Sequence, residues 1–157
     1  MSSGRPLEGV RILDHFHWWA GPLSTMLLAN MGAEVIKVEA PRRYDGFRLL
    51  SIGQPGEMGY EWSSAHNACN HDKHYITLDL TLARGRELFS ELIKISDVFT
   101  ESLRPGAMKS LGFGYEEVRA LRPDVLYVTP TYGAGPWSHY VGYGAPFGQL
   151  GGGAYLH

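Results

Sequence analysis

The chain has 157 residues, of which 44% are hydrophobic and 19% are charged, a composition typical of a folded globular domain and not of a disordered one. The formal net charge of −2 gives no electrostatic reason to expect nucleic-acid binding. The sequence contains no apolar run long enough for a membrane-spanning helix, no apolar signal-peptide region at its N-terminus and only one cysteine, Cys69, so we expect a cytoplasmic protein without disulfides or a membrane partner.

The N-terminal segment predicts a β-α-β unit. Residues 10–14 have the apolar character of a short strand, and residues 34–39 that of a second strand. Between them, residues 23–31 are rich in Leu, Met and Ala and predict a helix. Pro22 stands at the start of this helix, where its missing N–H costs nothing, and Gly32 ends it.

Strand and helix patterns continue to alternate after an irregular segment at 40–71, which is long enough to suggest a functional loop. The expected elements are a strand at 74–80, a helix at 83–95 capped by Thr81, a strand at 97–100, short helices after Pro105 and at 115–121, and a strand at 125–129. This alternation predicts an α/β, Rossmann-like fold, a parallel sheet with flanking helices. Ligands on such sheets bind at the carboxyl ends of the strands. The segments at these ends are 15–22, 39–45, 79–81, 100–106 and 130–136.

The first of these segments carries the most distinctive side chains. His15, His17, Trp18 and Trp19 stand between a strand end and a helix start, where the helix N-terminus favours an anion and aromatic rings can stack on a nucleobase. The alternative is that the tryptophans belong to the core and the histidines to the surface, and the sequence leaves both open. The turn offers only Gly21 in place of the G-x-G-x-x-G fingerprint, which argues against a nicotinamide dinucleotide.

Two cations are candidate phosphate ligands. Lys73 precedes the third strand and Arg104 follows the fourth; an ammonium can neutralise a phosphate, and a guanidinium can bind one with two hydrogen bonds. The alternative for Arg104 is an exposed residue of a turn. His71 and His74 lie close to Lys73, but the segment has neither a CxxC pattern nor a helical i, i+4 pair, so we predict no metal site there.

Several longer motifs follow one another in a specific order. They are PLEGVRILD at 6–14, AGP at 20–22, GAEVIKVE at 32–39, TLDL at 77–80, GREL at 85–88, SDVFTESLRPGAM at 96–108, LGFGY at 111–115, RPDVLYV at 122–128 and GY at 142–143. Taken together, they resemble the N-terminal part of CoA-transferase family III, also called the CaiB/BaiF family, whose fold is shared with alpha-methylacyl-CoA racemases. The resemblance covers nearly the whole chain.

The resemblance implies that the chain binds coenzyme A or an acyl-CoA as a substrate and holds no permanently bound cofactor. It places Arg104 against a phosphate of the CoA nucleotide, and His17 and Trp19 near the pantetheine end and the thioester. The residues expected to contact CoA are His17, Trp19, Ala20, Lys73, Leu78, Asp79, Leu80, Thr81, Ser102, Leu103, Arg104, Val141, Gly142, Tyr143 and Gly144.

The resemblance also implies a reaction, in which CoA moves from an acyl-CoA thioester to a free carboxylate by covalent catalysis on an aspartate. In the family pattern this aspartate follows the glycine run at 151–153 and falls beyond His157. We therefore expect residues 1–157 to be the CoA-binding N-terminal part of a longer enzyme, inactive alone, that forms an interlocked homodimer. Two alternatives stay open: a racemase-like isomerase, and a non-catalytic CoA-binding half of a tandem protein, which Trp19 and Gly144 favour.

Overall fold

A computed structural model of the chain describes residues 4–50, 59–130, 136 and 138–142. Within these residues, five strands form one sheet in the order β3-β2-β1-β4-β5, and every pairing is parallel. The strands are β1 (Arg11–His15), β2 (Glu34–Glu39), β3 (His74–Thr77), β4 (Val98–Glu101) and β5 (Leu126–Val128). The α-helices are α1 (Ala20–Asn30), α2 (Ser64–Ala68), α3 (Ala83–Lys94), α4 (Ala107–Ser110) and α5 (Tyr115–Leu121), and the 3-10 helices are η1 (Gly46–Leu50) and η2 (Gly59–Trp62).

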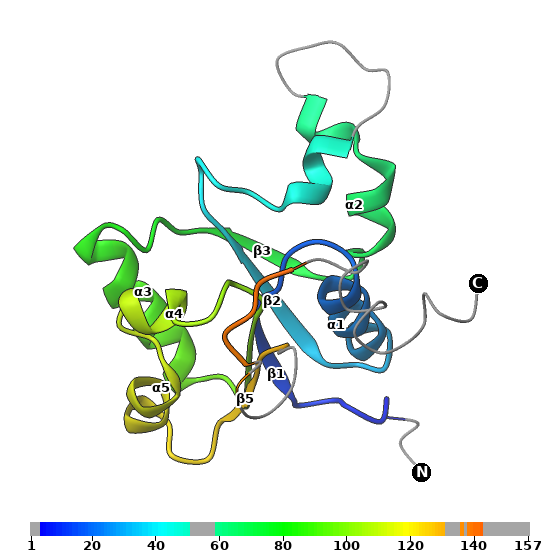
Figure 1. The fold of residues 1–157 in the computed structure, drawn as a ribbon. Coiled ribbons are helices and arrows are strands. Elements are labelled where there is room, and N and C mark those ends of the chain that lie inside the picture. The colour runs from blue at the N-terminus through cyan, green and yellow to red at the C-terminus, as the bar shows by residue number, and fades with distance from the viewer. Residues whose placement is uncertain (1–3, 51–58, 131–135, 137, 143–157) are drawn as a thin grey trace.

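Helices cover both faces of the sheet, with α1 on one face and α3, α4 and α5 on the other (Figure 1). The alternation of side chains along β1 accounts for the two layers, because successive strand residues point to opposite faces. Ile12 packs with Val35 and with Ala29 of α1, whereas Leu13 packs in a second cluster with Phe89 of α3. The predicted Rossmann-like α/β fold is confirmed. None of the described helices combines the length and the apolar character needed to cross a bilayer.

The structure corrects the sequence prediction at two places. Segment 40–71 contains η1, η2 and α2 in its described part, where the sequence predicted an irregular loop. Thr81 does not cap α3, because the N-cap is Leu82 and no side chain bonds the backbone there. The Asp79 carboxylate instead accepts the Thr81 N–H (2.9 Å) and the Thr81 hydroxyl (2.6 Å). This turn of the backbone ends the strand early, at Thr77.

Gly85 gives a test of how closely α3 packs against the turn at Asp79. A Cβ at Gly85 would overlap the carbonyl oxygen of Asp79. Alanine normally stabilises a helix relative to glycine by about 1 kcal/mol, but we expect G85A to lower the free energy of unfolding because the turn must move away from the helix. Urea denaturation measures the change, and E87A, at an exposed position of the same helix, serves as a control that should stay within about 0.5 kcal/mol of wild type. G85A at or above wild-type stability would contradict the packing described here.

Candidate functional site

A groove of about 1680 Å³ runs along the carboxyl ends of the strands. It is lined by the segments that follow all five strands, as expected for a ligand site on a parallel sheet. The described lining residues include twelve of the predicted site residues, namely His17, Trp19, Ala20, Leu78, Asp79, Leu80, Thr81, Ser102, Leu103, Arg104, Val141 and Gly142. Tyr143 and Gly144 lie outside the described residues. Lys73 does not line the groove.

The loop after β1 is held in place through its backbone. The N–H of His17 donates to the Ser102 hydroxyl (2.8 Å), and the N–H of Trp18 donates to the Asp45 carboxylate (2.8 Å). The ammonium of Lys37 donates to the carbonyl of Phe16 (2.6 Å). Side chains from the segments after β2 and β4, and from β2 itself, thus fix three consecutive residues of this loop.

Aromatic rings form one wall of the groove. Phe47 lies 6.1 Å from Trp18 and 6.3 Å from Trp19, measured between ring centroids. Trp18 has a φ of 69°, which is unusual for a residue with a bulky side chain, and Gly46 leaves room for it, because a Cβ there would lie 2.5 Å from the Trp18 ring. Trp19 is 64% exposed. The structure therefore places the tryptophans on the groove and not in the core, one of the two readings that the sequence left open.

The side chain of Lys73 is buried in a polar cluster. Its ammonium donates to the Asp14 carboxylate (2.9 Å), the Thr25 hydroxyl (2.8 Å), the Asn70 amide oxygen (2.9 Å) and the carbonyl of Pro22 (2.9 Å). Burial lowers the pKa of Lys73, and Asp14 opposes this shift. Since an ammonium has three N–H donors, these four acceptors leave none for a phosphate. We therefore do not retain the predicted phosphate role of Lys73.

His15 and His17 are titratable residues that line the groove. Burial, with smaller contributions from His17 and Lys37, lowers the pKa of His15 to about 3. Burial and Lys37 also lower the pKa of His17. Both imidazoles are therefore neutral at pH 7. The sequence placed His15 at a strand end but could not show that its ring is buried.

Three arginines bring positive charge to the groove. Arg104 follows β4, as predicted, and Arg42 and Arg43 follow β2. All three are exposed. The sequence analysis did not single out Arg42 and Arg43, although both lie in segment 39–45, which the strand-end rule selected.

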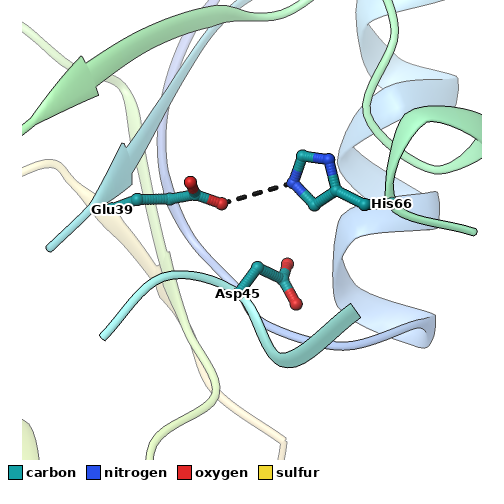
Figure 2. A group of neighbouring side chains, drawn as sticks. All are labelled: Glu39, Asp45 and His66. Atoms are coloured by element: carbon teal, nitrogen blue, oxygen red, sulfur yellow. Dashed lines mark hydrogen bonds and ion pairs between the residues drawn. The ribbon is translucent and has the colours of Figure 1, made fainter. Parts of the chain in front are cut away.

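A second cluster, of Glu39, Asp45 and His66, resembles a metal site at first sight because ligand atoms of all three lie within 4.8 Å of one another (Figure 2). Each carboxylate already has a cationic partner, however. Glu39 pairs with Arg48 (2.8 Å), and Asp45 pairs with Lys37 (3.1 Å). His66 lies 3.3 Å from Glu39. A further cation would meet two buried positive charges, so the cluster is an ion-pair network and not a metal site.

Comparisons with known proteins identify relatives over most of the chain. The sequence profile described as CoA-transferase family III matches residues 7–157. A succinyl-CoA:glutarate CoA-transferase from Mus musculus is 42% identical over 145 residues, which are 91% of this chain and 32% of the relative. A formyl-CoA:oxalate CoA-transferase from Bradyrhizobium sp. (strain ORS 278) is 40% identical over 134 residues, which are 85% of this chain and 31% of the relative.

A solved structure is also similar to this chain, in both fold and sequence. The crystal structure of a CAIB/BAIF family protein from Brucella suis superposes with a TM-score of 0.82 at 33% identity, over 95% of this chain and 40% of that one. The chain thus spans about a third of the length of the curated relatives it matches.

Because the Lys73 side chain is buried, we expect its substitution to lower the stability of the protein before it affects ligand binding. We expect K73M to lower the free energy of unfolding by about 3 to 5 kcal/mol, because the Asp14 carboxylate loses its ion-pair partner in a buried site. K94M removes an exposed lysine that pairs with Glu91 and should cost less than about 1 kcal/mol. Chemical denaturation of both variants makes the comparison. If K73M keeps wild-type stability and only loses affinity for a phosphate-bearing ligand, Lys73 belongs to the site after all.

The neutral state of His15 predicts a pH-dependent stability. The unfolded side chain has its ordinary pKa of 6.5 and the folded one a pKa of about 3, so unfolding takes up a proton between these values. The stability from a neutral His15 is complete above pH 6.5 and falls as the pH drops, by up to about 1.4 kcal/mol per pH unit. Denaturation at pH 7, 6 and 5 measures this slope, and H15F should reduce it by that amount. Equal slopes for H15F and wild type would contradict the assignment.

Proposed function

The chain belongs to CoA-transferase family III, and on that premise we propose that the protein transfers CoA from an acyl-CoA thioester to a free carboxylate. Two relatives are named for this exchange, one between succinyl-CoA and glutarate and the other between formyl-CoA and oxalate. Because the chain spans about a third of their length, we assign the activity to the complete protein. Residues 1–157 supply its CoA-binding part and are inactive alone.

The groove at the carboxyl ends of the strands is the observation that carries this proposal. CoA has phosphates and an adenine ring at one end and an uncharged pantetheine arm with the thiol at the other. Arg42, Arg43 and Arg104 offer cations for the phosphates. Trp19 and Phe47 offer aromatic surface for a flat ring or an apolar arm. A groove of about 1680 Å³ accommodates a ligand of this size.

The described part of the groove has one carboxylate among its lining residues, that of Asp79. Hydrogen bonds from the Thr81 side chain and backbone lower its pKa and engage the carboxylate in the turn before α3. We propose that the nucleophilic aspartate follows the glycine run at 151–153 and lies beyond His157. Its carboxylate attacks the acyl carbon, forming a mixed anhydride and releasing CoA as a thiolate; the thiolate then attacks the aspartyl carbonyl, releasing the donor carboxylate and leaving an aspartyl-CoA thioester.

In this proposal the acceptor carboxylate completes the exchange. It attacks the aspartyl-CoA thioester, and the thiolate that is released then attacks the acceptor's acyl carbon of the new anhydride, which restores the free aspartate. We also propose that the complete protein is an interlocked homodimer. Trp19, Leu49 and Trp62 are 64%, 68% and 67% exposed, and a covering segment or a second chain would bury such surface.

The protein as its gene encodes it can be assayed with an acyl-CoA and a panel of free carboxylates, using mass spectrometry to detect a new thioester. Transfer of CoA to any carboxylate supports the proposal. Exchange of the proton alpha to the thioester with solvent deuterium, without transfer, indicates the racemase-like isomerase. Binding of CoA without either reaction indicates a non-catalytic module.

Arg104 gives a specific prediction for CoA binding. We expect R104A to weaken CoA binding about 10-fold, because a phosphate loses a guanidinium partner, and we expect this loss to shrink at high salt. Isothermal titration calorimetry measures the dissociation constant. R84A is the matched control, since Arg84 is exposed on α3 and pairs with Glu87 away from the lining residues. Equal effects of R104A and R84A would remove Arg104 from the binding site.

A further inference from the structure

Two histidines stand over the central strand of the sheet, on the groove. His15 is the last residue of β1 and is 8% exposed, with its ring 6.1 Å from that of Phe89. His17 follows in the loop, and its backbone N–H donates to Ser102. The two imidazole rings lie 5.2 Å apart between centroids, and both residues line the groove.

Each ring has a nitrogen that the rest of the structure does not satisfy. Within the described part of the chain, Nδ1 of His15 and Nε2 of His17 are buried and have no hydrogen-bond partner. A buried polar atom without a partner costs about 1 to 3 kcal/mol, and native proteins hold few of them. Two such atoms in adjacent rings on a ligand groove indicate that a bound molecule completes their hydrogen bonding.

The charges around the rings decide what kind of group can bind there. Lys37 faces both histidines, and Asp14 acts on both from β1. Asp45 and Glu39 also act on His17 and favour its protonation, but burial and Lys37 outweigh them. A neutral imidazole has one donor nitrogen and one acceptor nitrogen. Such a pair offers hydrogen bonds but no positive charge for a phosphate or a carboxylate.

We propose that His15 and His17 form a hydrogen-bonding site for an uncharged carbonyl or amide group of the ligand, at the centre of the groove. The inference rests on the proposed function, since the pantetheine arm of an acyl-CoA carries amides and ends in a thioester carbonyl. A neutral pair binds this arm without competing with the flanking arginines for the phosphates. It thereby helps to set the position of the ligand along the groove.

Substitutions of His17 test the proposal in the complete protein. H17L removes both ring nitrogens, and H17Q keeps a neutral donor and acceptor. We expect H17L to weaken CoA binding about 5- to 10-fold, H17Q to stay within about 3-fold of wild type, and both to leave the binding of adenosine 3′,5′-bisphosphate unchanged, because that ligand lacks the pantetheine arm. H15F, which keeps a ring of similar size, should weaken CoA binding in the same way.

Two controls separate this effect from general damage. H74L removes an exposed histidine of β3 that is not among the groove residues and should bind CoA as wild type does. Thermal melting of each variant shows whether it folds. The pH dependence adds a second readout. Glutamine cannot take up a proton, and the ligand's own titration is common to both proteins. If the His17 imidazole binds in its neutral form, wild type and H17Q should therefore give parallel CoA affinities from pH 8 to pH 6.

The outcomes distinguish this inference from the proposed function. If H17L weakens the bisphosphate as much as it weakens CoA, His17 contacts the nucleotide end and the inference is wrong. If wild type binds CoA progressively more tightly than H17Q as the pH falls, an imidazolium binds an anion and the inference is equally wrong, although the CoA-binding function stands. If wild type binds no CoA, the proposed function fails and the inference fails with it.

Discussion

The arrangement of the segments around the groove depends on the carboxylate of Asp14. One of its oxygens accepts the Phe16 N–H (3.0 Å) and the Thr100 hydroxyl (3.0 Å), and the other accepts from Thr25 (2.8 Å) and Lys73 (2.9 Å). It therefore connects β1 to β4, to α1 and to the turn before β3. Burial raises the pKa of the Asp14 carboxyl, but Lys37 and Lys73 outweigh it and hold the pKa below its ordinary value. A buried charge with this many partners fixes the relative positions of the segments that it joins, and it adds little net stability.

A second buried pair fixes the same loop from the other side. Lys37 donates to the Phe16 carbonyl and pairs with Asp45, and Asp45 in turn accepts the N–H of Trp18. The left-handed backbone of Trp18 costs energy, of the order of 1 to 3 kcal/mol for such residues, and these bonds hold it there. The aromatic wall of the groove is thus a consequence of charged residues that lie beneath it.

The sequence predicted the features that depend on local pattern. Alternating strands and helices indicated the parallel sheet, and the strand-end rule selected the segments that line the groove. Where the outcome depends on tertiary packing, the local pattern could not decide it. Lys73 has the same sequence context whether it points at a phosphate or into the core, and only the positions of Asp14 and Thr25 decide between them. Thr81 has the composition of a helix cap, but the Asp79 carboxylate beside it competes for its donors.

The sheet order explains how charge is distributed along the groove. β1 lies between β2 and β4, so the arginines that follow β2 and β4 stand on either side of the neutral segment that follows β1. The ammonium groups of Lys37 and Lys73 donate to the backbone carbonyls of Phe16 and Pro22, and they would make this segment positive if they were unpaired. Asp45 and Asp14 neutralise them, one carboxylate for each ammonium. The centre of the groove therefore stays uncharged, and its positive potential comes from the exposed arginines at its flanks. We expect the phosphates and the uncharged groups of one ligand to bind at different places along it.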